Sequence, residues 1–175
     1  LYLGGTDTTI HAIANALYLL LTDSSVQAAV AADAPGMLKG LVEETMRLYG
    51  SVQYRYRIAV HDDMLADVPI ARGQKLVLLH AAANRDPRHY ACPAAVDFDR
   101  RPLADHLAFN MGPRACVGAL LARAEIDETL SAVLARLPAL QRDERADPPR
   151  NRGLFLRSFR PLHARWSTGG TNEGG

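Results

Sequence analysis

A single cysteine stands in a short loop that runs directly into a helix-forming segment. Residues 109–118 read FNMGPRACVG, and an Ala/Leu-rich stretch follows them from Ala119 onward. A sulfur placed just before a helix is close to free backbone N–H groups and to the positive end of the helix dipole, which favour the thiolate over the thiol. The position of Cys116 therefore suits a thiolate ligand.

The neighbours of Cys116 indicate what such a thiolate could bind. Arg114, two residues earlier, is a permanent cation with a planar fork that suits a carboxylate. Gly112 and Gly118 let the backbone turn tightly and let a flat group approach it closely. A cysteine, an arginine and glycines together suit a metal macrocycle that bears acid groups, and haem b is the obvious one.

The loop resembles the haem-binding loop of the cytochrome P-450 superfamily, whose pattern is Phe-Gly-x-Gly-x-Arg/His-x-Cys-x-Gly. The matching positions are Phe109, Gly112, Arg114, Cys116 and Gly118. Asn110 stands where the family usually has glycine, and asparagine tolerates a positive φ better than most residues. The resemblance implies that the matched residues bind haem, with Cys116 as the iron ligand. The alternative for a lone cysteine is a small buried side chain without chemistry.

The elements that must position this loop begin with an apolar segment at the start of the chain. Residues 1–21 predict a helix, which the stretch Gly4–Thr9 (GGTDTT) is expected to interrupt. Hydroxyl groups there can bond back to the preceding turn and open the helix into a kink or bulge. Such a helix offers a groove for a small ligand and a Thr–Asp pair able to relay protons. The alternative is a helix N-terminus capped by Thr6 or Asp7.

The same stretch resembles the family's Ala/Gly-Gly-x-Asp/Glu-Thr-Thr signature at every specified position. By this resemblance, Asp7 and Thr8 are the catalytic residues that deliver protons during oxygen activation. Gly4 and Gly5 are the residues that line the oxygen groove.

After a short helix at about residues 26–32, a further helix is expected over residues 37–49, which carry apolar side chains at helical spacing. Glu44 and Arg47 are neighbours on one face of it, and such a pair is usually solvated and contributes little. Here it resembles the family's Glu-x-x-Arg motif, which implies a buried pair that needs a third charged group. Our candidate for this structural ion-pair cluster is Arg101, with Arg100 as the alternative.

The middle of the chain changes to β-forming residues. Residues 52–60 predict a strand, and residues 68–79 predict a hairpin around positions 72–73. We therefore expect a small antiparallel sheet within a helical protein.

One arginine of this region is a candidate cofactor ligand. Residues 57–62 resemble the family's Arg-x-Ala/Leu-x-x-Asp strand, whose arginine binds a haem propionate. The resemblance implies this role for Arg57. Arg55, two residues earlier on the same strand face, is the alternative, and an exposed strand arginine without a ligand is a further one.

The remaining segments complete the expected architecture. Residues 87–105 are rich in proline and should be irregular, residues 117–137 predict a long helix, and residues 141–152 predict a surface loop. The resemblance covers residues 1–166, which we expect to be the C-terminal, haem-binding part of one cytochrome P-450 domain, mainly α with small antiparallel β-sheets. Residues 167–175 are expected to be a disordered tail.

Composition narrows the class of protein. The 175 residues are 48% hydrophobic with a net charge of +1, which is ordinary for a globular protein and argues against nucleic acid as a partner. Two cysteines make no disulfide framework, and the longest apolar run is too short to span a bilayer. With no signal peptide visible, a cytoplasmic location is expected. The chain starts at Leu1 within an expected helix, so we expect it to be part of a longer protein.

The resemblance as a whole implies a function. Members of the family are haem-thiolate monooxygenases that insert one oxygen atom of O₂ into an organic substrate by hydroxylation or epoxidation. The implied electron source is NAD(P)H, through a ferredoxin-type partner or a flavoprotein reductase, and the implied substrate is small and hydrophobic. The bacterial members look most similar. The alternatives are an inactive, truncated haem-binding remnant and a peroxide-driven peroxygenase, which the Asp7–Thr8 pair disfavours.

Overall fold

The first helix runs without a break through the polar stretch that was expected to interrupt it. In the computed structural model, which describes residues 2–167, α1 extends over Tyr2–Thr22. The hydroxyls of Thr6 and Thr8 do donate back to the carbonyls of Tyr2 and Gly4, at 2.9 and 2.6 Å. These bonds are added to the helical ladder and do not open it, so the predicted interruption is wrong.

Two capped helices follow, and their caps explain where they begin. Asp23 accepts hydrogen bonds from two N–H groups at the start of α2 (Ser24–Ala32). Asp33 does the same for α3 (Ala34–Tyr49), accepting from Gly36 N at 3.0 Å, and a proline stands in the first turn. Each cap contributes about 1 kcal/mol of helix stability.

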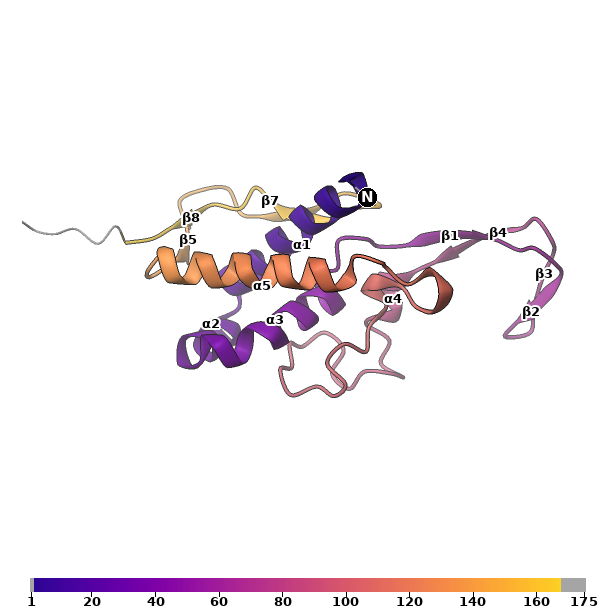
Figure 1. Cartoon of the computed structure of the whole chain (residues 1–175), viewed down its shortest axis with the longest axis horizontal. Helices are drawn as coiled ribbons and strands as arrows, with labels where there is room; N and C mark the ends of the chain where they lie inside the picture. Colours follow the sequence, from indigo (N-terminus) through magenta and orange to yellow (C-terminus); the bar gives the residue numbers. More distant parts are fainter. Residues whose placement is uncertain (1, 168–175) are drawn as a thin grey trace, which may run out of the picture.

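The core lies where α1, α3 and α5 (Ala119–Arg136) pack against one another. Its fully buried apolar side chains come from four helices: Ala16 from α1, Val26 from α2, Leu41 from α3, and Ile126 and Leu130 from α5. Figure 1 shows that the N-terminal ends of α1 and α5 lie at the same end of the helical body.

Four short strands follow α3 in the sequence, and their pairing differs from the expected hairpin. β1 (Arg55–Ile58) pairs antiparallel with β4 (Lys75–Leu78), while β2 (Asp63–Leu65) pairs with β3 (Val68–Ile70). The predicted pairing of the two halves of residues 68–79 is therefore wrong. Together these strands form a ribbon that extends from the helical body (Figure 1).

The backbone explains this pairing. The tight turn is made by Ala66 and Asp67, whose φ angles of +46° and +65° match the two-residue turns that join antiparallel strands. Gly73, at φ +84°, does turn the chain as expected, but its N–H donates to Ala59 O at 2.8 Å. This bond directs β4 back along β1 instead of along β3.

The segment of residues 79–118, between β4 and α5, is largely irregular, as predicted for residues 87–105. It contains α4 (His80–Ala83) and the short 3₁₀ turns η1 (Leu107–Phe109) and η2 (Gly112–Arg114).

The C-terminal part forms two more strand pairs. β5 (Gln141–Arg142) pairs with β8 (Ala164–Arg165), and β6 (Arg150–Arg152) pairs with β7 (Ser158–Arg160). The expected surface loop at residues 141–152 is thus bounded by two short strands. Of the expected tail, Ser167 donates its N–H to Pro138 O at 3.0 Å, and residues 168–175 lie outside the described residues.

The described chain is mainly α with small antiparallel sheets. Among its described residues, no helix combines the length and the apolar character needed to cross a membrane.

Candidate functional site

The cysteine loop, which we define as residues 107–118, is closed by one backbone hydrogen bond. The N–H of Cys116 donates to Phe109 O at 2.8 Å, and the Cys116 carbonyl accepts from Ala119 N at 3.3 Å. Gly118 is the N-cap of α5, so the sulfur stands two residues before the cap, and Cys116 is a free, exposed thiol. The loop therefore presents this sulfur on its surface beside the start of α5.

Asn110 has the glycine-like backbone that its place in the pattern requires. Its φ and ψ are +61° and −173°, a region that side chains strongly disfavour. Its side-chain Nδ2 donates to Arg114 O at 2.9 Å, which ties the two 3₁₀ turns of the loop together. Gly112 also has a positive φ, of +64°. The expectation that Asn110 adopts a positive φ is confirmed.

The predicted glycines leave open space in front of the backbone. A methyl group added at Gly4, Gly5 or Gly112 would meet no atom within 4 Å, and one at Gly118 would lie 3.9 Å from Cys116 Sγ. Large apolar side chains of the loop and of the first turn of α5 are also uncovered: Met111, Val117, Leu120 and Leu121 are 68%, 90%, 82% and 62% exposed. An apolar surface of this kind marks a place where another group binds.

Arg55 and Arg57 share one face of β1, and the buried His80 lies near them. Arg55 and Arg57 alternate with exposed residues along β1 and share its half-buried face. Burial lowers the pKa of Arg55 most, and the charge of a Cys116 thiolate would raise it, so the sulfur is within electrostatic range of this guanidinium. Neither arginine forms an ion pair among the described residues, so both remain available to an acid group.

His80, the first residue of α4, lies near these two arginines, and no feature of the sequence distinguished it. It is 4% exposed, and its Nδ1 atom has no hydrogen-bond partner among the described residues. Burial lowers its pKa most, and the charges of Arg55 and Arg57 lower it further. A buried, unpartnered nitrogen beside two unpaired arginines fits a site that receives an acidic group from a ligand.

Among the described residues, no hydrogen bond or ion pair joins the other predicted site residues, Arg114, Asp7 and Thr8, to one another. Arg114 ends η2 and is exposed. Asp7 is exposed on α1, and Thr8 is half-buried with its hydroxyl bonded to Gly4 O. The helix that carries Asp7 and Thr8 packs against α5 and begins at the end of the body where α5 begins (Figure 1).

The ion-pair cluster is buried, but its third member is not the predicted one. Arg47 donates to both carboxylate oxygens of Glu44, at 2.6 and 2.8 Å, and both side chains are 1% exposed. Arg100 Nε lies 3.3 Å from Glu44 Oε1, and its side chain is 10% exposed. Arg101 is exposed and donates only to the carbonyls of Phe98 and Arg100, so the choice of Arg101 is wrong.

Arg47 also fixes the irregular segment that precedes the cysteine loop. Its Nη1 and Nη2 atoms donate to the carbonyls of Asn84, Pro93 and Ala95 at 3.0, 2.7 and 2.8 Å. The cluster is therefore a structural device that attaches the segment to α3.

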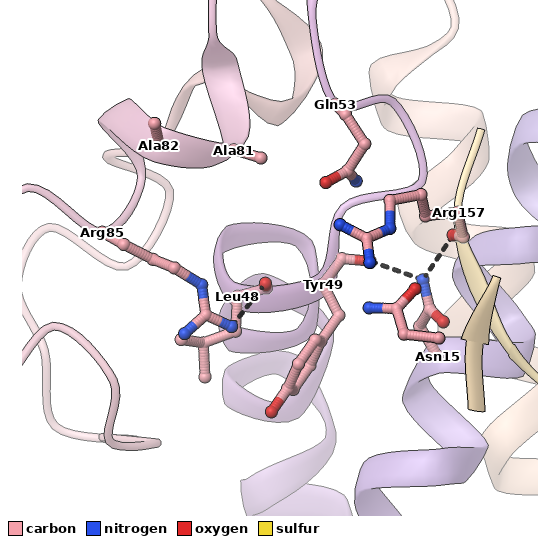
Figure 2. Close-up of a pocket in the computed structure, with 9 residues that line it drawn as sticks. Asn15, Leu48, Tyr49, Gln53, Ala81, Ala82, Arg85 and Arg157 are labelled. Carbon is pink, nitrogen blue, oxygen red and sulfur yellow. Dashed lines mark hydrogen bonds between the residues drawn. The ribbon is translucent and has the colours of Figure 1, made fainter. Parts of the chain in front are cut away.

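A hollow of about 340 Å³ lies elsewhere in the molecule, between α1, the end of α3, α4 and the C-terminal strands (Figure 2). Asn15 donates to the carbonyls of Tyr49 and Arg157, at 2.6 and 3.1 Å, and Arg85 donates to Leu48 O at 2.8 Å. No residue of the cysteine loop lines this hollow. These bonds join α1 to α3 and to the residue before β7, and join the segment after α4 to α3. They are separate from the site around Cys116.

The site combines the Cys116 thiol with unpaired arginines. It also has exposed apolar side chains and open space in front of its glycines. These features together suit one kind of ligand. The sulfur suits a metal ion, the arginines suit carboxylates, and the apolar surface suits a flat hydrophobic ring. The donors present therefore fit an iron macrocycle that bears acid groups.

Comparisons with known proteins support this interpretation. Residues 1–163 match the family described as Cytochrome P-450. The chain is 38% identical over 142 residues to Cytochrome P-450 105C1 of a Streptomyces species, covering 81% of this chain and 37% of the relative. It is 38% identical over 141 residues to the C-19 steroid 1alpha-hydroxylase of Sorangium cellulosum, covering 81% and 36%. The chain thus spans about a third of the length of the curated relatives that it matches.

Solved structures show the same similarity. A cytochrome P-450 of Mycobacterium marinum in its substrate-free form gives a TM-score of 0.89 at 26% identity, covering 97% of this chain and 43% of that one. P450BioI in complex with an acyl carrier protein that carries hexadec-9Z-enoic acid gives a TM-score of 0.86 at 32% identity, covering 94% and 42%.

Proposed function

Because the chain belongs to the cytochrome P-450 family and has its fold, we propose that the whole protein is a haem-thiolate monooxygenase. Residues 1–166 would be the C-terminal, haem-binding part of its single domain. The observation that carries this proposal is the closed loop that presents the exposed Cys116 sulfur beside the start of α5.

The residues of this chain would hold haem b from one side. Cys116 would be the iron ligand, and Gly112, Gly118 and Phe109 would shape the loop around it. The open space at Gly4 and Gly5 leaves room for a small molecule such as O₂. When bound, the haem supplies the activation of O₂, and a thiolate ligand promotes cleavage of the O–O bond.

The cations near the sulfur would neutralise the acid groups of the cofactor. Arg57 was the expected ligand, and Arg55 on the same face of β1 is equally unpaired, so we propose that both contribute. Arg114, from the loop itself, is exposed and available for the same role. Bidentate bonds between guanidinium and carboxylate would fix the orientation of the ring.

Asp7 and Thr8 would hold and move the protons that oxygen activation consumes. Thr8 donates its hydroxyl proton to Gly4 O at 2.6 Å, which leaves the lone pairs of Oγ1 free to accept a hydrogen bond. The exposed carboxylate of Asp7, one position earlier, can exchange protons with solvent.

The substrate and electron donor follow from the relatives as proposals. One relative is named a steroid hydroxylase, and P450BioI was solved with a fatty acyl chain on its carrier protein. We propose a small hydrophobic substrate, hydroxylated or epoxidised, with electrons from NAD(P)H through a ferredoxin-type partner or a flavoprotein reductase. A cytoplasmic location suits NAD(P)H and keeps the Cys116 thiol reduced.

Electron paramagnetic resonance of the ferric, haem-loaded, full-length protein tests the iron ligand. The parent should give the low-spin signal of a thiolate-ligated haem, and Cys116→Ala should lose it. A Cys92→Ala control removes the other exposed thiol and should leave the signal unchanged. An unchanged signal in Cys116→Ala would remove this sulfur from the proposal.

A further inference from the structure

A second buried carboxylate lies next to the ion-pair cluster but serves different partners. Glu43 on α3 is 3% exposed. Its Oε1 accepts from Arg123 Nε at 2.5 Å, and its Oε2 accepts from Arg123 Nη2 at 3.0 Å and from His106 Nε2 at 2.9 Å. Burial alone would raise the pKa of this carboxyl, but the bonds from His106 and Arg123 outweigh it and hold the pKa at about 2. Glu43 is therefore a fixed anion with three donors.

His106 connects Glu43 to the start of the cysteine loop. Its Nδ1 accepts the N–H of Ala108 at 3.2 Å, which makes it the N-cap of η1. A ring whose Nδ1 accepts can donate from Nε2, so both bonds can be made at once. Both nitrogens are in use, and the side chain is 1% exposed. The orientation of this ring is thus set by α3 on one side and by the loop on the other.

Arg123 connects Glu43 to the far end of the loop. It lies in the second turn of α5, the helix that begins directly after the loop. Its guanidinium also stacks over the ring of Phe109 at 4.5 Å, and the Phe109 carbonyl accepts the Cys116 N–H at 2.8 Å. A continuous path of contacts therefore runs from Glu43 through Arg123 and Phe109 to the backbone of Cys116.

Between these attachments, and among the described residues, the hydrogen bonds of residues 110–116 join them only to the loop itself and to Ala119. The regular parts of the loop are two single 3₁₀ turns, which have poor hydrogen-bond geometry. Residues 111–117 are all exposed. The position of the sulfur therefore depends on how the two ends of the loop are attached to the helical body.

We propose that Glu43, His106 and Arg123 form a clamp that holds both ends of the cysteine loop on α3 and so positions the Cys116 sulfur. The three are positioning residues, since none of them touches the sulfur. The inference rests on the proposed function where it concerns iron ligation. The attachment of the loop to α3 is independent of it.

Glutamine and lysine substitutions test the clamp in the haem-loaded, full-length protein. Glu43→Gln and Arg123→Gln remove one charge of the pair, and Arg123→Lys keeps the charge but loses the bidentate bond and the stacking. The matched control is Arg88→Gln, which breaks a bidentate arginine–carboxylate pair whose arginine side chain is 89% exposed. An exposed pair of this kind contributes little.

The readout is the rate at which the ferrous–CO form loses its thiolate band in mild urea, measured beside the helical circular dichroism. Glu43→Gln and Arg123→Gln should lose the band about tenfold faster while the helices stay folded, with Arg123→Lys in between and Arg88→Gln equal to the parent. The double variant should be no faster than the worse single one, because both break the same clamp. Rates equal to the parent, or loss of the band only in step with the helices, would overturn the clamp.

Hydrogen exchange separates this inference from the proposed function. The amides of residues 108–119 should exchange faster in Glu43→Gln and Arg123→Gln than in Arg88→Gln, with or without haem. If the parent itself lacks a thiolate band, the proposed function fails, and unchanged loop exchange would still reject the clamp by itself. Faster exchange confined to the loop would support the clamp even then.

Discussion

The N–H of Cys116 donates to the carbonyl of Phe109 across 2.8 Å, and this bond closes the cysteine loop. It joins the first matched residue of the loop to the residue that carries the sulfur. The loop is therefore held in its form by its own backbone and by the contacts at its two ends.

Replacing Asn110 tests the backbone of the loop. A side chain at φ +61°, ψ −173° costs about 1–3 kcal/mol, while the exposed bond from Asn110 to Arg114 O returns about 0.5–1.5 kcal/mol. Asn110→Gly should therefore match or exceed the parent in the urea midpoint of the thiolate band. Asn110→Ala keeps the strain and loses the bond, so it should fall below both; an alanine variant as stable as the glycine variant would show that the strain is absent.

Arg100 and Arg101 form a natural matched pair. Arg100 lies 3.3 Å from Glu44 and is nearly buried, while Arg101 is exposed and bonds only to carbonyls. Arg100→Ala should lower the free energy of unfolding by about 1–3 kcal/mol, and Arg101→Ala should change it by less than about 0.5 kcal/mol. Denaturant unfolding of the full-length protein measures both, and the reverse order would contradict the assignment of the cluster.

Removing Arg47 should have a larger effect than either change. It leaves Glu44 buried and frees three carbonyls of the preceding irregular segment. Breaking such a pair costs about 3–5 kcal/mol, so Arg47→Ala should prevent haem incorporation by disrupting the fold. A normally folded holo-protein from this variant would show that the pair does not hold the segment in place.

The acid sensitivity of the protein should depend on Glu43. Its pKa is about 2 in the folded chain against an ordinary value of 4.5. A carboxyl with a depressed folded-state pKa contributes stability that is fully present above the unfolded value and is lost as the pH falls through the folded one. Between about pH 5 and pH 2 the parent should therefore lose more stability than Glu43→Gln, as thermal unfolding across this range would measure. Parallel curves would mean that Glu43 is not held ionised by its partners.

Thr6 and Thr8 make the same hydrogen bond on α1, so comparing their variants distinguishes a chemical role of Thr8 from a structural one. Both hydroxyls donate to the carbonyl four residues earlier, but only Thr8 belongs to the proposed proton-delivery pair. Thr8→Ala in the full-length protein should consume reductant severalfold faster than it forms product and release peroxide. Thr6→Ala should stay coupled; equal coupling in the two variants would remove Thr8 from the mechanism. Turnover with peroxide alone would favour the peroxygenase alternative.

The helices could be predicted well because their signals are local. Asp33 and Pro35 mark the start of α3, and Pro138 follows the end of α5, as expected from capping and proline geometry. The membership of the chain in the cytochrome P-450 family and its mainly α fold, both predicted from short motifs, are confirmed.

The predictions failed where the structure depends on contacts between residues that are far apart in the sequence. The predicted hairpin failed because the tight turn falls at Ala66 and Asp67, an alanine–aspartate pair without the glycine or asparagine that usually marks such a turn. The Glu43 cluster was missed because His106 and Arg123 lie 63 and 80 residues away in the sequence. The choice between Arg100 and Arg101 depends on which of two adjacent side chains turns inward, and the motif does not distinguish them.

The ferrous–CO difference spectrum of the haem-loaded, full-length protein, with Cys116→Ala beside it, decides whether Cys116 is the iron ligand. We expect the red-shifted Soret band of a thiolate-ligated haem in the parent and in Cys92→Ala, and its loss in Cys116→Ala. The same band in Cys116→Ala, or its absence from the parent, would contradict the assignment of Cys116 as the iron ligand.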